Sequence, residues 1–452
     1  MISYHARWIL PVSAPPIHDG CVTVSKGRIV YVGPMSSAPT VEMRTFGNGV
    51  LMPGLVNAHT HLELTAMRGF LEDLAFRPWV LRLTKARAEV LNRERMLASA
   101  IVAIAEGLQA GITTFADTSS SGVGHEALRT TGARGIVYQE VFGPHPDECT
   151  AAMAELSRNV TELRRADTTL VKTGVSPHAP YTVSDALFSA VADYARAEEL
   201  QVAVHIAESE AESQLVKNGD GAFANAWKVR DIPVGVRAVS PVALLEKTGL
   251  LRTRPLLIHC VRVGGVDMTR MMDTGCGVAH CPVSNAKLGH GIAPLHEMLQ
   301  LGLQVGLGTD SVASNNRMDV LDDARFALLL QRARLGSPDA LGATRVLEMA
   351  TLGGARAIGL SREIGSLEVG KAADFAAFSL DGVREVPAYD PASALVYSVA
   401  GRPAKAVFVE GKELVRDGQV RFDVEPTRRK VQDIGQALSQ WLEVKGSTSA
   451  TI

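Results

Sequence analysis

Eight short apolar segments recur along the middle of this 452-residue chain, and this repetition constrains the fold more than any other feature. Each segment is followed by a polar loop, and helical patterns such as residues 93–110 and 184–198 separate them. Alternating strand and helix units favour a parallel sheet, and eight of them predict a (β/α)8 barrel of the TIM type. The expected strands are residues 50–56, 113–117, 135–140, 170–175, 201–206, 256–259, 277–280 and 304–307.

Both ends of the chain have a different pattern, in which short strands and turns replace the helices. Residues 21–32 indicate one hairpin, and residues 406–415 indicate a second one near the other end. We therefore expect the two ends to combine into one small composite β-sandwich domain beside the barrel. The expected boundaries are residues 1–52 and 366–425 for the β-sandwich and residues 53–365 for the barrel.

The remaining residues, 426–452, are expected to form a C-terminal helix and tail. The helix is indicated by a stripe of apolar side chains at helical spacing, namely Val431, Ile434, Leu438 and Trp441. The last residues, from Gly446 onward, are expected to fray, as chain ends do when nothing holds them.

Charge and cysteine content narrow the class of protein. A formal net charge of −2 creates no general electrostatic field for nucleic acid or an anionic membrane. The five cysteines are odd in number and have no disulfide-framework spacing, which favours a reducing compartment. No apolar run approaches the ~18 residues that indicate a membrane span. We expect a cytoplasmic protein with a small-molecule partner and with neither nucleic acid nor membrane as a partner.

Side chains suited to metal chemistry follow five of the expected strands, at the end of a barrel where active sites form. They are His59 and His61 after the first strand, His178 after the fourth, His205 in the fifth, His259 in the sixth and Asp310 after the eighth. Three imidazoles and one carboxylate suit zinc or ferrous iron. We therefore expect His59, His61, His205 and Asp310 to bind one divalent metal ion, zinc in preference to iron. Such an ion would lower the pKa of a bound water.

Glu208 lies three residues after His205 and is the expected proton carrier. A carboxylate above the fifth strand can take a proton from the attacking water and pass it to the substrate. The alternative is that Glu208 only favours a helix N-terminus. His259 could hold the same water or stabilise its charge. Asp310 could bind metal through one oxygen and accept a hydrogen bond from water through the other.

A barrel with two metal ions is the main alternative for this site. It requires a carbamylated lysine from the fourth strand, and Lys172 is the residue available. Lys172 precedes His178 by six residues, so it is expected in mid-strand rather than at the rim. The acid of His205-x-x-Glu208 also fits a site with one metal ion better.

The chain resembles the amidohydrolase superfamily, and within it the mononuclear deaminase and chlorohydrolase branch, in six stretches spread over almost its whole length. These are PGLVNAHTH (residues 53–61), SPHAPY (176–181), HIAE (205–208), LIHC (257–260), HCPVSN (280–285) and GTDS (308–311). The resemblance implies the metal ligands named above, with Glu208 and His259 in catalysis. In deaminases of this branch, water attacks the ring carbon that bears an amino group, the glutamate protonates the adjacent ring nitrogen, and ammonia leaves. Dimers are common in the branch, so we expect a homodimer.

The resemblance also suggests residues that contact the substrate. His178 typically faces the substrate ring in this branch, and Ser284 and Asn285 follow the seventh strand at the same end of the barrel. Trp79 could pack on the ligand, although core packing explains a tryptophan equally well. Arg87, Arg82 and Arg262 are candidates for binding a substrate carboxylate, with surface salt bridges as the alternative.

Glu63, in the Leu62-Glu63 pair after His61, makes the chain look most like the aminofutalosine deaminases. The spacing Phe76-x-x-Trp79 points the same way. We therefore expect a metal-dependent deaminase of a 6-aminopurine nucleoside, with aminofutalosine favoured. Alternatives in the same branch are a guanine, 8-oxoguanine or pterin deaminase and a triazine chlorohydrolase. An alternative from another class is a non-catalytic binding protein that a metal ion stabilises.

Overall fold

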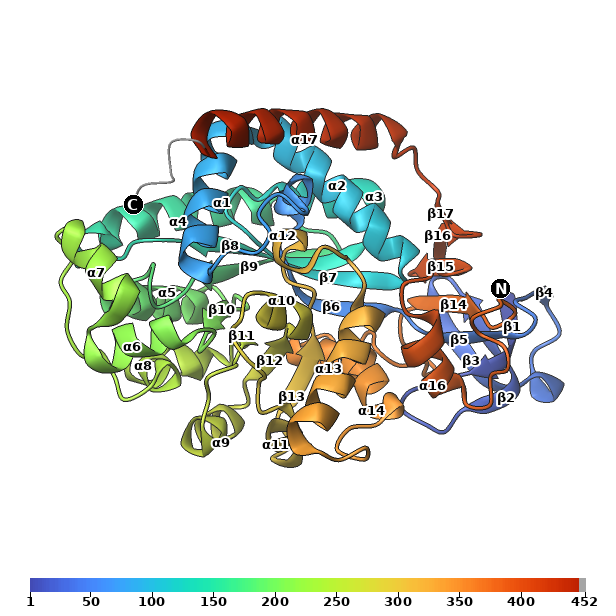
Figure 1. Cartoon of the computed structure of the whole chain (residues 1–452). Helices are drawn as coiled ribbons and strands as arrows, with labels where there is room; N and C mark the ends of the chain where they lie inside the picture. Colours follow the sequence, from blue (N-terminus) through green and yellow to red (C-terminus); the bar gives the residue numbers. More distant parts are fainter. Residues whose placement is uncertain (447–452) are drawn as a thin grey trace.

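The computed structural model describes residues 1–446 and contains the expected eight-stranded parallel barrel (Figure 1). Its strands form two hydrogen-bonded groups of four. Isolated parallel bridges between Val175 and Val202 and between Thr60 and Asp310 join the groups into a closed ring. The strands are β6 (Leu55–Thr60), β7 (Ile112–Ser119), β8 (Arg134–Val141) and β9 (Val171–Pro177), then β10 (Ala203–Ile206), β11 (Leu256–His259), β12 (Gly277–His280) and β13 (Gln304–Leu307).

Helices cover the outside of these strands (Figure 1). The short 3-10 helix η2 (Leu62–Met67) follows β6 directly. The α-helices of this part are α1 (Phe76–Val90), α2 (Arg93–Gln109), α3 (Val123–Thr131), α4 (Cys149–Arg164), α5 (Asp185–Ala197), α6 (Glu210–Asn218), α7 (Gly221–Val229), α8 (Pro241–Lys247), α9 (Gly265–Thr274), α10 (Pro282–Lys287), α11 (Leu295–Gln300), α12 (Val312–Asn315), α13 (Val320–Leu335), α14 (Ala343–Glu348) and α15 (Gly354–Ala357).

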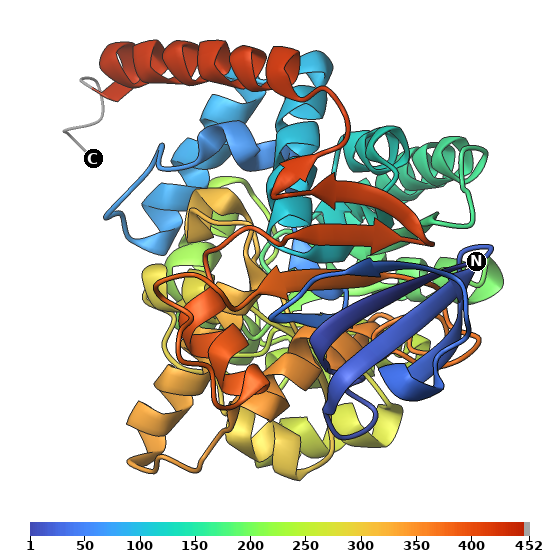
Figure 2. The same cartoon turned by 90° about the vertical axis from the view of Figure 1, so that its right-hand side faces the viewer.

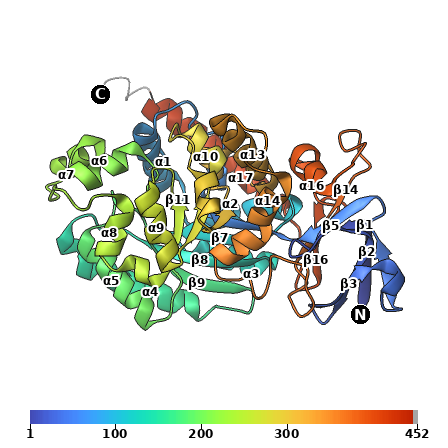
Figure 3. The same cartoon turned by 90° about the horizontal axis from the view of Figure 1, so that it is seen from below.

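The two ends of the chain combine into one nine-stranded sheet, which Figure 2 shows face-on. An antiparallel pairing of β5 with β14 joins the N-terminal strands to the C-terminal strands. Around this joint, the rings of Tyr4, Phe375 and Phe408 pack with centroids 4.5–5.1 Å apart. Seen from below, the sheet lies at one side of the barrel (Figure 3). Its strands are β1 (Ile2–Ile9), β2 (Ile17–Ser25), β3 (Arg28–Pro34), β4 (Glu42–Thr45), β5 (Gly49–Pro53), β14 (Phe375–Ser379), β15 (Ala406–Val409), β16 (Lys412–Arg416) and β17 (Gln419–Val420), and helix α16 (Pro391–Ala394) lies between β14 and β15.

The expected first barrel strand, residues 50–56, is in fact two strands. β5 belongs to the terminal sheet, whereas the barrel begins with β6 after Gly54. Both parts are fully buried and apolar, so hydrophobicity along the sequence does not separate them. A side chain at Gly54 would meet the Thr113 Oγ1 atom at 2.1 Å, which shows how closely the chain passes β7 at this break.

The expected C-terminal helix is α17 (Glu425–Gly446), which runs across α1 and α2 (Figure 1). Its predicted apolar stripe faces the barrel, and Ile434 and Leu438 are buried against Trp79 and Leu83 of α1. Fraying was expected from Gly446 onward; Gly446 is the last residue of α17, and residues 447–452 lie outside the described residues. Among the described helices, none combines the length and the apolar character that crossing a membrane requires.

A buried ion pair connects the terminal sheet to the barrel. Arg134, at the start of β8, donates from Nε to Asp374 Oδ2 at 2.7 Å and from Nη2 to Oδ1 at 3.2 Å. Asp374 Oδ1 also accepts the backbone N–H of Glu410 at 2.7 Å. Both side chains are almost fully buried, so removing one partner leaves a charge without compensation. The pair therefore connects the C-terminal part of the terminal sheet to the amino end of the barrel.

We predict that Arg134→Ala lowers the free energy of unfolding by about 3–5 kcal/mol, because Asp374 would stay buried without its partner. The measurement is the midpoint of urea unfolding followed by tryptophan fluorescence. Arg164→Ala is the matched control, since it removes an exposed pair with Glu198 at 2.9 Å and should cost about 1 kcal/mol or less. Equal midpoints for the two variants would contradict this role of Arg134.

Candidate active site

Four of the side chains expected to bind metal converge at the carboxyl end of the barrel. His59 Nε2 lies 3.4 Å from Asp310 Oδ1, and His61 Nε2 lies 3.6 Å from the same oxygen. His61 Nε2 also lies 3.3 Å from His205 Nε2. The four come from β6, from the residue after it, from β10 and from the loop after β13. Closure of the barrel brings them together although they are far apart in sequence.

The chemistry of these atoms fits a single divalent metal ion. His59 is fully buried, and neither of its ring nitrogens has a hydrogen-bond partner among the described residues. Buried polar atoms nearly always have a partner, so the two nitrogens are exceptions that need an explanation. Burial lowers the pKa of His59 to about 4, which keeps its ring neutral as metal binding requires. Imidazole and carboxylate together are donors for zinc or non-haem iron.

Neighbouring groups orient three of these side chains. His205 Nδ1 lies 3.1 Å from the carbonyl oxygen of His178, so a proton there leaves Nε2 free to face the cluster. His61 Nδ1 lies 3.2 Å from the hydroxyl of Thr118. Asp310 Oδ2 accepts hydrogen bonds from Ser284 at 2.6 Å and Ser314 at 3.1 Å. The second oxygen of Asp310, which we expected to accept from water, is therefore occupied by two serine hydroxyls.

Three strands end at or just before residues with a left-handed backbone, at the carboxyl end of the barrel, which we call the mouth of the site. Ala207, His259 and Asp310 have φ values of 51°, 74° and 56°, a region that residues with a side chain seldom adopt. Backbone hydrogen bonds hold these turns, including Asp310 N–H to the His59 carbonyl at 3.0 Å. Such strain persists only where surrounding structure enforces it, and it concentrates at functional sites.

Glu208 lies beside the cluster and is 4% exposed. Its Oε1 atom is 3.2 Å from His290 Nε2 and 3.6 Å from His259 Nε2. Burial alone would raise the pKa of Glu208, but the two imidazoles lower it below its ordinary value. Both carboxylate oxygens of Glu212 accept backbone N–H groups, those of Ala207 and Glu208, and thereby hold the turn that presents Glu208.

Two residues of this site were missed by the sequence reasoning. His290 lies in a loop well past the end of β12, so the strand-end pattern could not find it. Glu140 could have been found, because it is the last residue of the expected third strand. Its Oε1 atom is buried without a hydrogen-bond partner among the described residues, and burial raises the pKa of Glu140 to about 7. Glu140 has a ligand atom within 4.8 Å of those of His178 and His205.

His178 lies at the mouth, where the sequence placed it. Its ring is 4.8 Å from the ring of His205 and 5.0 Å from that of Phe142, centroid to centroid. The Nδ1 atom pairs with the Thr182 hydroxyl at 2.7 Å. Burial lowers the pKa of His178 to about 3, so the ring is neutral and can hydrogen-bond a polar heterocycle.

Glu63 and Arg87, both expected to contact substrate, contact each other. Arg87 Nη2 donates to Glu63 Oε1 at 2.6 Å. The Ser119 hydroxyl donates to Glu63 Oε2 at 2.7 Å, and Ser121 donates to the same oxygen. Both oxygens of Glu63 are thus used within the chain, which favours a role in holding η2 and α1 together.

Trp79 is buried in the apolar cluster under α17. Phe76, three residues earlier in α1, instead reaches over the site and contacts the rings of Tyr181, Phe223 and His290. Its contact with His290 is edge-on, with centroids 4.6 Å apart. Phe76, rather than Trp79, is therefore the aromatic residue of α1 that contacts a side chain of the site, namely His290.

Ser284 and Asn285 lie in α10, the helix after β12, near the mouth as expected. The Ser284 hydroxyl donates a hydrogen bond to Asp310 Oδ2. Asn285 is 1% exposed, and neither atom of its side-chain amide has a partner among the described residues. Its amide is therefore available to a polar ligand.

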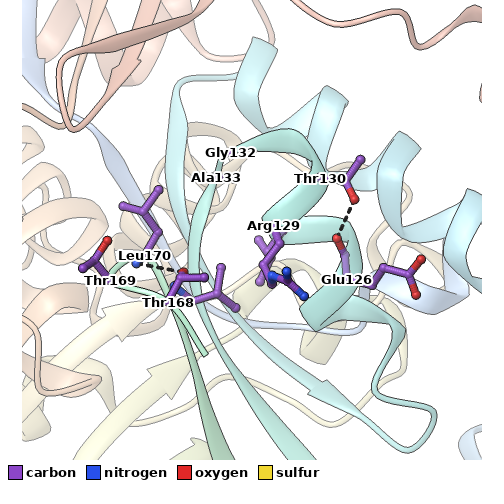
Figure 4. A pocket seen from close by; sticks show the side chains of 10 residues that line it. Glu126, Arg129, Thr130, Gly132, Ala133, Thr168, Thr169 and Leu170 are labelled. Atoms are coloured by element: carbon purple, nitrogen blue, oxygen red, sulfur yellow. Dashed lines mark hydrogen bonds between the residues drawn. The ribbon is translucent and has the colours of Figure 1, made fainter. Parts of the chain in front are cut away.

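The structure does not support a lysine that bridges two metal ions. Lys172 is exposed, so its side chain does not point into the barrel. The chain also has a surface hollow of about 600 Å³ between residues of α3 and the turn before β9, drawn in Figure 4. That hollow adjoins the amino ends of β8 and β9, whereas the histidine cluster occupies the carboxyl ends. It therefore belongs to a different face of the molecule.

Comparisons with known proteins agree with this geometry. The model of the amidohydrolase family matches residues 50–414. A 5-methylthioadenosine/S-adenosylhomocysteine deaminase of Moorella thermoacetica is 35% identical over 422 residues, which cover 91% of this chain and 94% of that protein.

Two solved structures have the same fold. An adenosine deaminase from Xanthomonas campestris with bound zinc superimposes with a TM-score of 0.87 at 30% identity, covering 97% of this chain and 98% of that one. The Helicobacter pylori aminofutalosine deaminase gives a TM-score of 0.80 at 21% identity, covering 92% and 100%, a likeness of fold alone. The barrel, the histidine and aspartate cluster and these matches together show that the chain belongs to the amidohydrolase family.

Proposed function

We propose that this protein is a hydrolytic deaminase of a 6-aminopurine nucleoside. The observation that carries the proposal is the placement of Glu208, a buried carboxylate beside a convergent set of three imidazoles and a carboxylate. A protein that bound a metal ion without catalysing a reaction would not need a carboxylic acid at this position. The relatives named as adenosine-type deaminases support the choice of an amino group on a purine.

We assign His59, His61, His205 and Asp310 as the ligands of one divalent ion, zinc in preference to iron. Such an ion, when bound, supplies Lewis-acid activation of water at neutral pH. His259 has a ligand atom within 4.8 Å of those of His59 and Asp310, so its ring can hydrogen-bond the attacking water. The neutral ring of His178 faces the same space from β9 and can orient the purine.

Glu208 moves the protons in this proposal. It takes a proton from the attacking water as the oxygen bonds to the ring carbon that carries the amino group. It then delivers that proton to the adjacent ring nitrogen. The remaining proton of the water goes to the amino group, the C–N bond breaks, and ammonia leaves with an oxo group left on the ring. Burial strengthens each of these interactions because little water competes with them.

The substituent on the sugar decides which nucleoside is used. The pattern around Glu63 favours aminofutalosine, whereas the curated relative in the comparison acts on methylthioadenosine and adenosylhomocysteine. Because Arg87 is already paired with Glu63, a substrate carboxylate would have to use Arg82 or Arg262 at the rim. Arg262 is exposed beside Gly291, the residue after His290. A homodimer in the cytoplasm remains a prediction.

We predict ammonia release from 6-aminopurine nucleosides with a substituent at the 5′ position. The measurement compares aminofutalosine, methylthioadenosine, adenosylhomocysteine and adenosine with guanine, 8-oxoguanine, a pterin and a chlorotriazine. Loss of the adenine absorbance and formation of the hypoxanthine product would accompany the ammonia. Turnover of free guanine or of the chlorotriazine alone would rule out the proposed function.

We predict that Glu208→Gln keeps the bound metal and loses about 10²-fold or more in turnover, because the amide cannot carry the proton. Metal content by elemental analysis and ammonia release from the best nucleoside are the two measurements. Glu297→Gln on α11 is the matched control and should leave both unchanged. Turnover near the control value would remove Glu208 from the mechanism.

We predict that His59→Ala purifies without stoichiometric metal, because it removes a ligand from the buried centre of the cluster. Elemental analysis also identifies the metal, and about one zinc per chain is expected for the unaltered protein. His296→Ala, which changes a histidine on α11, should retain the metal. Full occupancy in His59→Ala would refute the assignment of this ligand.

A further inference from the structure

Two imidazoles approach the same oxygen of Glu208. Oε1 lies 3.2 Å from His290 Nε2 and 3.6 Å from His259 Nε2. Resting on the proposed function, we propose that His290 is a positioning residue: it holds Oε1 by a hydrogen bond and thereby leaves Oε2 for proton transfer. His290 belongs to none of the stretches on which the family resemblance rests.

The loop of His290 is shaped to return this side chain to the mouth. Gly289 and Gly291 flank it with φ values of +72° and +102°, which a residue with a side chain would seldom adopt. The backbone N–H of His290 donates to the Asn285 carbonyl at 2.9 Å, and this contact anchors the loop to α10. Phe76 of α1 then covers the outer edge of the ring. The backbone of His290 is thus fixed by the loop, and its ring is 4% exposed.

Glu208 is the natural acceptor for His290. The 3.2 Å approach falls short of good hydrogen-bond geometry, and His290 Nε2 has no other partner among the described residues. A buried nitrogen without a partner is costly, and contacts in a catalytic site often tighten only when substrate is bound. A proton on Nε2 would stabilise the carboxylate form of Glu208. It would also prevent the carboxylate from rotating, so that the same oxygen always meets water and substrate.

A merely structural role for His290 makes a different prediction from a positioning role. If the ring only fills space under Phe76, an apolar side chain of similar size should serve as well as an amide. If the Nε2 donor matters, a side chain that places an N–H at the same reach should restore function and an apolar one should not. Glutamine places its amide nitrogen as many bonds from the backbone as histidine Nε2, which makes it the conservative replacement.

The experiment compares His290→Leu with His290→Gln in zinc-loaded enzyme, with His296→Leu on α11 as the control. For His290→Leu we expect kcat to fall by about tenfold to a hundredfold, less than most of the ~10²–10⁴-fold that proton transfer contributes, because Glu208 itself remains, while KM stays within about threefold. His290→Gln should recover most of the lost kcat. Equal losses in both variants, a loss confined to KM, or wild-type kcat in His290→Leu would each overturn the proposal.

A crystal structure of each zinc-loaded protein provides a readout that needs no substrate. In the unaltered enzyme, Glu208 Oε1 should bond to His290 Nε2 while Oε2 faces the metal side, and in His290→Leu the carboxylate should rotate. An unchanged carboxylate in His290→Leu, or no bond to His290 in the unaltered enzyme, would refute the role. If the unaltered enzyme releases ammonia from no nucleoside, the proposed function fails, and the two structures still decide the placement of Glu208.

Discussion

The buried cluster of imidazoles and a carboxylate is the constraint on which the rest of the structure depends. Polar groups taken out of water cost free energy unless partners compensate for them, and neither ring nitrogen of His59 has a hydrogen-bond partner among the described residues. Only a rigid frame can hold such groups at 3.3–3.6 Å from one another. The barrel supplies that frame, because the bridge between Thr60 and Asp310 closes it between residues 250 positions apart. The candidate metal ligands therefore come together only when the barrel closes, because they are far apart in the sequence.

Four carboxylates near the mouth fall into two classes. Those of one class stabilise the surrounding loops, and those of the other can interact with a ligand. Glu63 and Glu212 have both oxygens used within the chain, by Arg87 and serine hydroxyls in one case and by backbone N–H groups in the other. Glu140 Oε1 has no hydrogen-bond partner among the described residues, and Glu208 Oε1 faces two imidazoles at 3.2 and 3.6 Å. A saturated carboxylate stabilises a loop, whereas an unsaturated buried one is retained at a cost. Of these four residues, Glu208 and Glu140 are therefore the acids available to a ligand.

The sequence predicted the barrel, the joining of the two ends and the four converging side chains, because strand periodicity and strand-end position suffice for those. The same rule could have identified Glu140 but not His290, whose loop returns to the mouth only through the turns at two glycines. Phe76 and Trp79 are three residues apart and lie on one face of α1, so the sequence pattern does not distinguish them. The packing of α17 decides which of them is buried in the core. The break at Gly54 was invisible for a similar reason, since both strands that it separates are apolar throughout. Contacts between distant segments account for each of these gaps.

The last described helix of the chain contributes to the mouth without touching it. α17 packs Ile434 and Leu438 against the face of α1 that carries Trp79 and Leu83. Phe76, three residues before Trp79 in the same helix, contacts the ring of His290, whose Nε2 lies 3.2 Å from Glu208 Oε1. Burial of a large apolar side chain contributes about 1.5–3 kcal/mol, so the α17 contacts are large enough to decide where α1 sits. Phe76, which contacts His290 beside Glu208, thus belongs to a helix against which the C-terminal helix packs.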